Sequence, residues 1–169
     1  MKKRESVYFL GIGGIGMSAL ARYFKAKGFD VAGYDRTSTL LTKELEAEGI
    51  SIHYNDDVAL IPELYKDPQN TMVVYTPAIP SDMSELVWFR EQQFNVCKRS
   101  QALGEVTRMQ QAICVSGTHG KTTTSTMIAH LLHNSSVKCN AFLGGISKNF
   151  DRNLLLSNES DLVVIEADE

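Results

Sequence analysis

The chain has 169 residues, with 17 Lys or Arg and 20 Asp or Glu, so its formal net charge is −3 (17 − 20). This mildly acidic balance argues against a nucleic-acid scaffold and against a polybasic membrane binder. Hydrophobic residues make up 43% and charged residues 22%, as in a folded domain, and no apolar stretch approaches the ~18 residues of a membrane span.

Strand-like and helix-like segments alternate along the first part of the chain. Strands are expected at 7–10, 30–34, 51–54, 71–75 and 95–98, and helices at 15–27, 39–48, 83–93 and 101–109. Gly28 and Gly49 end the first two helices as C-terminal glycine caps. Because strands that alternate with helices form a parallel sheet covered by helices, the expected fold class is α/β, with a Rossmann-like first domain at residues 1–109.

The same pattern starts again after a polar patch near residue 110. A strand is expected at 112–116, a helix at 122–133, and further strands at 137–142 and 162–166. These elements predict a second parallel α/β domain at residues 110–169. Since they are too few to close a core, and the last strand stops where acidic residues arrive, we expect the chain to be part of a longer protein.

The three cysteines are an odd number at wide spacing, Cys97, Cys114 and Cys139. Two of them lie in apolar strand-like runs, which predicts reduced thiols in the core and a cytoplasmic location. Trp88 and Phe89 are also expected in the core, because their helix carries other apolar residues.

The segment Gly11–Gly16 fits the pattern G-x-G-x-x-G between a strand and a helix. Glycines let the backbone approach a pyrophosphate, and the helix N-terminus adds N–H groups and a partial positive charge. Asp35 ends the next strand, where a carboxylate often meets a ribose hydroxyl. Either NAD or a UDP sugar would supply the pyrophosphate. The alternative is that the glycines only allow a helix and a strand to pack closely.

The segment Thr76–Pro80 follows the fourth expected strand and contains two prolines, so it cannot continue as a strand or a helix. At the carboxyl end of the sheet, Thr76 would line the same crevice as the glycine loop. A plain structural turn is the alternative.

The segment Ser116–Thr123 follows an apolar strand and opens a helix, as a P-loop does. In such a loop backbone amides cradle phosphate, Lys121 meets β- and γ-oxygens, and the Thr122 hydroxyl reaches Mg²⁺. The glycine spacing is shorter than in the general pattern, so a chance Gly-Lys-Thr at a helix start is the alternative. Two phosphate loops in one chain favour an enzyme that binds a nucleotide-linked substrate and also consumes ATP.

With both loops, the chain resembles the N-terminal part of the Mur ligases, which form amide bonds with ATP in peptidoglycan precursor synthesis. Gly117–Thr123 is similar to the phosphate loop of that family, which has this shorter spacing. Gly11–Ser18 is similar to the member that adds L-alanine to UDP-N-acetylmuramate. Glu166–Glu169 resembles the acidic motif of that member and of a relative that recycles a tripeptide. The resemblance covers all 169 residues, and the proteins of the family are several times longer.

The resemblance implies a role for each loop. The residues that would hold the UDP part of UDP-N-acetylmuramate are Gly11, Gly13, Gly14, Gly16, Asp35 and Thr76. Those that would form the ATP loop are Gly117, Thr118, His119, Gly120, Lys121, Thr122 and Thr123. Lys121 would be catalytic, neutralising charge on the transferred phosphoryl group. Thr122 and Glu166 would hold Mg²⁺, with Asp168 and Glu169 beside them or solvated.

The implied reaction is ATP-dependent addition of L-alanine to UDP-N-acetylmuramate through an acyl phosphate. The chain by itself is expected to bind the UDP substrate and not to catalyse. Three alternatives stay open: the tripeptide-recycling ligase, an NAD-binding module, and a non-catalytic domain that binds a UDP sugar.

Overall fold

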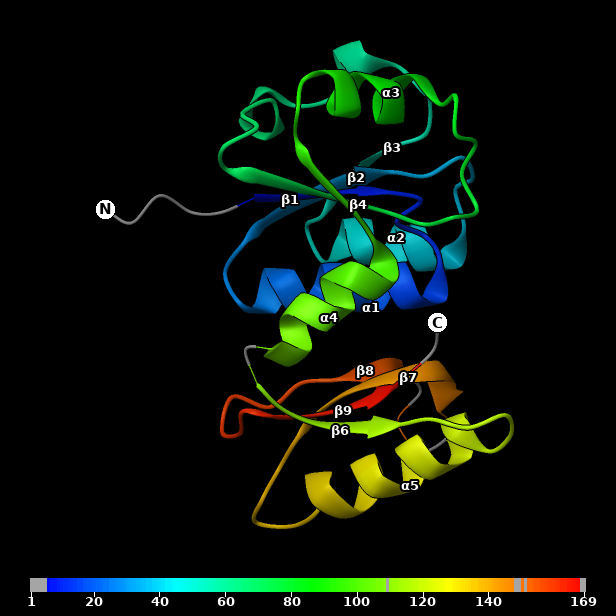
Figure 1. Cartoon of the computed structure of the whole chain (residues 1–169), viewed down its shortest axis with the longest axis vertical. Helices are drawn as coiled ribbons and strands as arrows, with labels where there is room; N and C mark the ends of the chain where they lie inside the picture. The colour runs from blue at the N-terminus through cyan, green and yellow to red at the C-terminus, as the bar shows by residue number, and fades with distance from the viewer. Residues whose placement is uncertain (1–5, 109, 148–149, 151, 168–169) are drawn as a thin grey trace. The chain divides into compact units, whose positions relative to one another are not determined.

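The computed structural model describes residues 6–108, 110–147, 150 and 152–167. These residues form two compact units, Met1–Arg99 and Ser100–Glu169 (Figure 1). The functional assignment of 1–109 and 110–169 to two domains stays a prediction.

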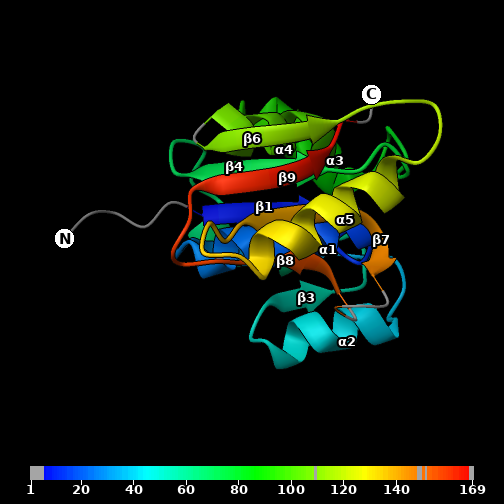
Figure 2. The same cartoon turned by 90° about the horizontal axis from the view of Figure 1, so that it is seen from below.

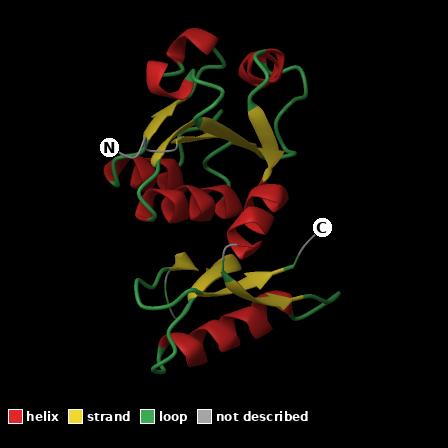
Figure 3. Cartoon of the chain, turned by 60° about the vertical axis from the view of Figure 1, so that its left-hand side comes forward, coloured by secondary structure: helices red, strands yellow, loops and turns green. Residues whose placement is uncertain are grey.

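The first unit is a parallel sheet with helices on both faces (Figure 3). Its strands are β1 (Ser6–Leu10), β2 (Asp30–Tyr34), β3 (Ser51–His53), β4 (Thr71–Tyr75) and β5 (Asn95–Lys98). Its helices are α1 (Ile15–Ala26), α2 (Leu40–Ala47) and α3 (Ser84–Glu91), with 3₁₀ turns η1 (Val58–Leu60) and η2 (Glu63–Tyr65). The strand order is β3-β2-β1-β4-β5, all parallel, which confirms the expected α/β class.

This order changes direction between β1 and β4, because β2 and β3 lie on one side of β1 while β4 and β5 lie on the other. In open parallel sheets, ligands bind beyond the carboxyl ends of the strands at such a switch point. The loops that follow β1 and β4 are therefore the part of this unit to search for a site.

The core of the first unit is built around β1, which is buried along its whole length. A central parallel strand is covered on both faces, so its residues are almost all apolar. On the face of α3, Tyr8 packs against Phe89, with ring centroids 5.2 Å apart, and Phe89 packs against Phe94 at 4.9 Å. Phe89 is completely buried, as expected from the sequence. Trp88 is half-buried and packs against the same cluster.

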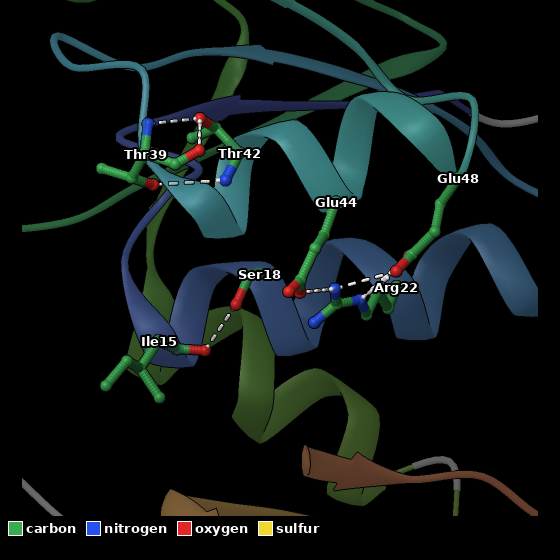
Figure 4. Close-up of polar contacts among 7 residues, drawn as sticks. All are labelled: Ile15, Ser18, Arg22, Thr39, Thr42, Glu44 and Glu48. Carbon is green, nitrogen blue, oxygen red and sulfur yellow. Dashed lines mark hydrogen bonds and ion pairs between the residues drawn. The ribbon is translucent and has the colours of Figure 1, made fainter. Parts of the chain in front are cut away.

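Helices α1 and α2 are joined by charged side chains on their exposed surfaces (Figure 4). The Arg22 guanidinium donates from Nε to both oxygens of Glu48 at 2.9 Å and from Nη2 to Glu44 at 3.1 Å. Thr39 and Thr42 form a capping box that starts α2. Such a cap contributes about 0.5–2 kcal/mol, and an exposed ion pair about 1 kcal/mol or less. The cap stabilises the start of α2, and the Arg22 ion pairs hold α2 against α1, the helix that follows the glycine loop.

The second unit is a four-stranded sheet with one long helix. Its elements are α4 (Arg99–Arg108), which begins at the division between the units, then β6 (Gln111–Val115), α5 (Lys121–His133), β7 (Asn140–Ser147), β8 (Arg152–Leu155) and β9 (Leu162–Glu166). The strand order is β6-β9-β7-β8. Figure 2 shows α5 in front of this sheet, and a core cluster joins Ala129 of α5 to Ala141 and Val164 of the strands.

Two expectations for the second unit were wrong. The strand expected at 137–142 begins at Asn140, because Lys138 has φ +55°, which is incompatible with an extended strand, and it runs on to Ser147. Strand β8 was not expected, and it pairs antiparallel to β7. This sheet is therefore mixed, with an antiparallel edge strand on a parallel β6-β9-β7 core.

The cysteines only partly follow the prediction of core thiols. All three are free, but Cys114 is exposed and Cys97 is half-buried, whereas Cys139 is buried. Burial raises the pKa of the Cys139 thiol. β6 lies at the edge of the described sheet, and its Ile113 side chain packs against the core. Because side chains alternate along a strand, Cys114 points to the opposite face of the sheet, where it is exposed. None of the helices in the described residues has the length and apolarity to cross a membrane.

Candidate functional site

The first candidate site is the turn that connects β1 to α1. Backbone N–H groups of Gly11 and Ile12 both donate to the Tyr34 carbonyl, at 2.8 and 3.0 Å, so the end of β2 holds this turn. Gly11 has φ +83°, which strongly favours glycine. Gly14 is the N-cap residue of α1. The glycine loop, residues Gly11–Gly16, thus lies between a strand and a helix N-terminus at the switch point, as its pattern requires.

Thr76 and Asp35 both contact the glycine loop. A Cβ atom at Gly11 would lie 2.5 Å from the Thr76 methyl carbon, and one at Gly13 would lie 2.8 Å from Asp35 Oδ2. Thr76 is held by its own N–H, which donates to the Leu10 carbonyl at 3.2 Å. Glycine is therefore required at positions 11 and 13 because a larger residue would collide with Thr76 or Asp35. Close packing was the alternative explanation that the sequence left open for these glycines. That packing also brings the predicted residues together around the loop.

The carboxylate of Asp35 makes two hydrogen bonds to backbone in this structure. Oδ2 accepts from the Gly13 N–H at 2.7 Å, and Oδ1 accepts from the Thr37 N–H at 3.0 Å. Asp35 thus fixes the shape of the glycine loop. Its predicted contact with a ribose hydroxyl stays a prediction.

The second candidate site is the loop between β6 and α5. Gly120 is the N-cap residue of α5 with φ +79°, and its carbonyl accepts from the Thr124 N–H at 2.9 Å. The Lys121 ammonium folds back over the loop and donates to the Gly117 carbonyl at 2.8 Å. The remaining predicted members of this loop are exposed: Thr118, His119 and Thr123. The loop therefore presents a lysine and a helix N-terminus at the carboxyl end of a parallel strand.

Glu166, at the end of β9, ties the second site together. Its Oε2 accepts from the Thr122 hydroxyl at 3.1 Å. Its Oε1 accepts from the Ser125 hydroxyl at 3.0 Å and from the Gly144 N–H at 2.7 Å. The two predicted metal ligands are thus in contact although they are far apart in sequence. Ser125 and Gly144 were missed by sequence reasoning, and the one usable signal was that Ser125 lies one helical turn after Thr122. Predicted Asp168 and Glu169 lie outside the described residues.

This oxygen pair fits Mg²⁺. No group of three His, Cys, Asp or Glu side chains that could hold a metal exists in the described part of the chain. Mg²⁺ is usually held by one or two protein oxygens together with substrate phosphates and water. The Thr122 hydroxyl and Glu166 carboxylate have that chemistry, and they lie beside the loop that the sequence predicts to hold phosphate.

A buried polar network, also missed from the sequence, lies next to the first site. The Tyr8 hydroxyl oxygen lies 3.0 Å from Glu85 Oε2 and 2.5 Å from His53 Nε2. His53 Nδ1 is 2.9 Å from the Asn55 carbonyl, and the Asp56 carboxylate accepts from the Glu85 N–H at 3.0 Å. Glu85 is completely buried, although a glutamate at a helix start would ordinarily be exposed.

Burial sets the charges in this network. Removal from water is the largest cause that raises the pKa of Glu85 to about 8, and the charges of Asp56 and Asp57 add to it. Burial also lowers the pKa of His53. Near neutral pH, Glu85 is therefore protonated and His53 is neutral.

We expect the stability of the chain to fall between pH 5 and pH 8 relative to the Glu85→Gln variant, by about 2–4 kcal/mol. In this range the folded protein keeps a proton on Glu85 that the unfolded chain has released, so rising pH favours unfolding. His53 acts in the opposite sense below pH 6.5, but it is present in both proteins. Urea unfolding at several pH values measures the difference. If the free energy of unfolding depended on pH in the same way for the two proteins, the conclusion that Glu85 is protonated in the folded state would be wrong.

Known proteins resemble the chain over its whole length. Residues 6–111 match the family described as Mur ligase family, catalytic domain. UDP-N-acetylmuramate–L-alanine ligase of Porphyromonas gingivalis is 61% identical over 165 residues, which is 98% of this chain and 36% of that protein. The chain thus spans about a third of the length of the curated relatives it matches.

Solved structures of ligases share the fold. The structure of UDP-N-acetylmuramate-alanine ligase from Thermotoga maritima has a TM-score of 0.79 and 30% identity, covering 96% of this chain and 37% of that one. UDP-N-acetylmuramate:L-alanyl-gamma-D-glutamyl-meso-diaminopimelate ligase from Neisseria meningitides has a TM-score of 0.85 and 29% identity, covering 99% and 53%.

Proposed function

The chain belongs to the Mur ligase family, and from this premise we propose that it is the substrate-nucleotide part of a UDP-N-acetylmuramate–L-alanine ligase, together with the beginning of its ATP site. The observation that carries the proposal is the presence of two glycine-containing loops, each between a parallel strand and a helix. The name of the relatives at about 60% identity supports L-alanine as the amino acid.

In this proposal the first unit holds the UDP group. The diphosphate lies against the glycine loop and the N-terminus of α1, where N–H groups and the helix dipole favour an anion. Thr76 and Asp35 line the crevice around it, since both already contact the glycine loop. A cytoplasmic location and the substrates UDP-N-acetylmuramate and L-alanine are parts of the same proposal.

The second unit would bind ATP through residues 117–123. Lys121 would move from the Gly117 carbonyl to the phosphate oxygens, because a phosphate competes more strongly for an ammonium than a neutral carbonyl does. Thr122 and Glu166 would hold Mg²⁺, which when bound supplies charge neutralisation on the phosphates. Ser125 and the Gly144 N–H keep the Glu166 carboxylate oriented toward Thr122.

Calorimetric titration of the 169-residue chain with UDP-N-acetylmuramate and with NADH tests the proposal. We expect binding of the UDP sugar and none of NADH. Binding of NADH alone would replace the proposal by a dinucleotide-binding module. A tripeptide-recycling ligase would bind the same nucleotide sugar, so this titration does not distinguish it from the L-alanine ligase. The two are distinguished in a chain extended to the length of its relatives, by measuring product formation with L-alanine and with the tripeptide as the amine.

A further inference from the structure

We propose that Arg99 is the cationic partner of the diphosphate that the glycine loop holds. This inference rests on the proposed function for the position of the diphosphate and adds a binding residue that neither motif contains. It begins from the packing of Gly16, the last glycine of the loop.

The guanidinium of Arg99 lies directly against Gly16. A Cβ atom at position 16 would be 2.9 Å from Arg99 Nη1, 3.1 Å from Cδ and 3.3 Å from Cζ. Arg99 follows β5, so it enters from the same carboxyl edge of the sheet as the glycine loop itself. The absence of a side chain at Gly16 thus makes room for an arginine at the start of α1.

A bound anion would give the Arg99 guanidinium a charged partner. Arg99 is half-buried, and its guanidinium forms no ion pair or hydrogen bond with any residue that the structure describes. The start of α1 carries partial positive charge, and its first turn contains no acidic residue. Two positive groups therefore converge on the place where the motif expects a diphosphate, and a guanidinium is well suited to pair with phosphate oxygens through two parallel N–H bonds.

Asp35 places the opposite charge at the other side of the loop. Its carboxylate bonds to the Gly13 and Thr37 N–H groups and not to Arg99. A diphosphate beside the loop would be attracted by Arg99 and repelled by Asp35. Loss of the positive charge at Arg99 is therefore expected to lower the affinity of the site for an anion.

The test uses the whole chain with UDP and with inorganic pyrophosphate as probes, measured by calorimetry. All proteins carry Lys121→Ala, so that the second phosphate loop contributes no cation to the result. We expect Arg99→Gln to weaken binding of UDP and of pyrophosphate by about tenfold or more. Lys27→Gln is the charge-matched control, because it removes a positive charge from the exposed far end of α1, and it should change affinity by less than about twofold.

Equal affinities of the Arg99→Gln protein and its parent for pyrophosphate and UDP would overturn the inference, as would a parent protein that binds neither probe. Arg99-dependent binding of pyrophosphate without binding of UDP-N-acetylmuramate would overturn the proposed function and leave the anion site standing. If Arg99→Gln does not fold, Gly16→Ala decides. Its methyl group displaces the guanidinium without changing charge, and unaltered pyrophosphate affinity in that variant would also count against Arg99.

Discussion

Replacing Lys121 with alanine is expected to lower ATP-dependent ligation by about a hundred- to a thousandfold in a chain extended to the length of its relatives. The ammonium lies over the phosphate loop, 2.8 Å from the Gly117 carbonyl, where it would neutralise charge on the transferred phosphoryl group. Binding of UDP-N-acetylmuramate should be unchanged, because the residues proposed for it lie in the first unit. Product formation and calorimetric binding measure the two effects separately.

Lys138→Ala is the matched control for this variant. It removes the same charge from the same unit, but the Lys138 ammonium donates to the His133 carbonyl at the other end of α5. Ligation by this control should stay within about twofold of the parent protein. If the Lys121→Ala protein forms product at the parental rate, the assignment of the phosphate loop is wrong.

Phe89→Ala should destabilise the first unit by about 3–5 kcal/mol, a large part of the stability of a domain this size. The ring is completely buried and contacts the rings of Tyr8, Trp88 and Phe94, with centroids 4.9–5.2 Å apart. Truncation leaves a cavity that these rigid rings cannot fill without leaving their rotamers. Urea unfolding followed by the fluorescence of Trp88, the one tryptophan, reports directly on this cluster.

Leu40→Ala provides the comparison for Phe89→Ala, since the Leu40 side chain is 78% exposed. Its loss should cost about 0.5 kcal/mol or less. A Phe89→Ala protein as stable as the Leu40→Ala protein would show that the aromatic cluster is not the core of this unit.

The middle of the first sheet was predictable because strands β1, β2 and β4 are largely buried and mostly apolar. All five strands lie where they were predicted, and the first two helices were indicated by their apolar spacing and by the glycines that end them. The segment with η1 and η2 was not found, since 3₁₀ turns have no long periodicity. It nevertheless contributes Ile61 and Tyr65 to the core.

The second sheet was harder to predict for two physical reasons. Gly144 and Gly145 lie inside β7, although glycines ordinarily indicate a turn, and the Gly144 N–H is needed by Glu166. Strand β8 is short, and its stability comes from pairing with β7, which sequence patterns do not record.

Among the site residues, the loops were visible from their glycines and their position between strand and helix. Arg99, Ser125 and Glu85 were not, because each depends on a partner from a distant part of the chain. An isolated arginine, serine or glutamate in a helix is typical of a solvated surface. Only the fold reveals that Glu85 is buried and that Arg99 covers Gly16.

The order β6-β9-β7-β8 has a consequence for how the protein is made. Among the described strands β6 pairs only with β9, so it has no neighbour on the ribosome until residues 162–166 have left the exit tunnel. The first sheet is complete once β5 has emerged. During synthesis, the glycine loop is therefore complete, and could bind the nucleotide that we propose for it, while the loop after β6 still follows an unpaired strand. Domains generally fold in this N-terminal-first order. A nucleotide that binds to the first unit at this stage would stabilise its folded state before β9, the strand between β6 and β7, has been synthesised.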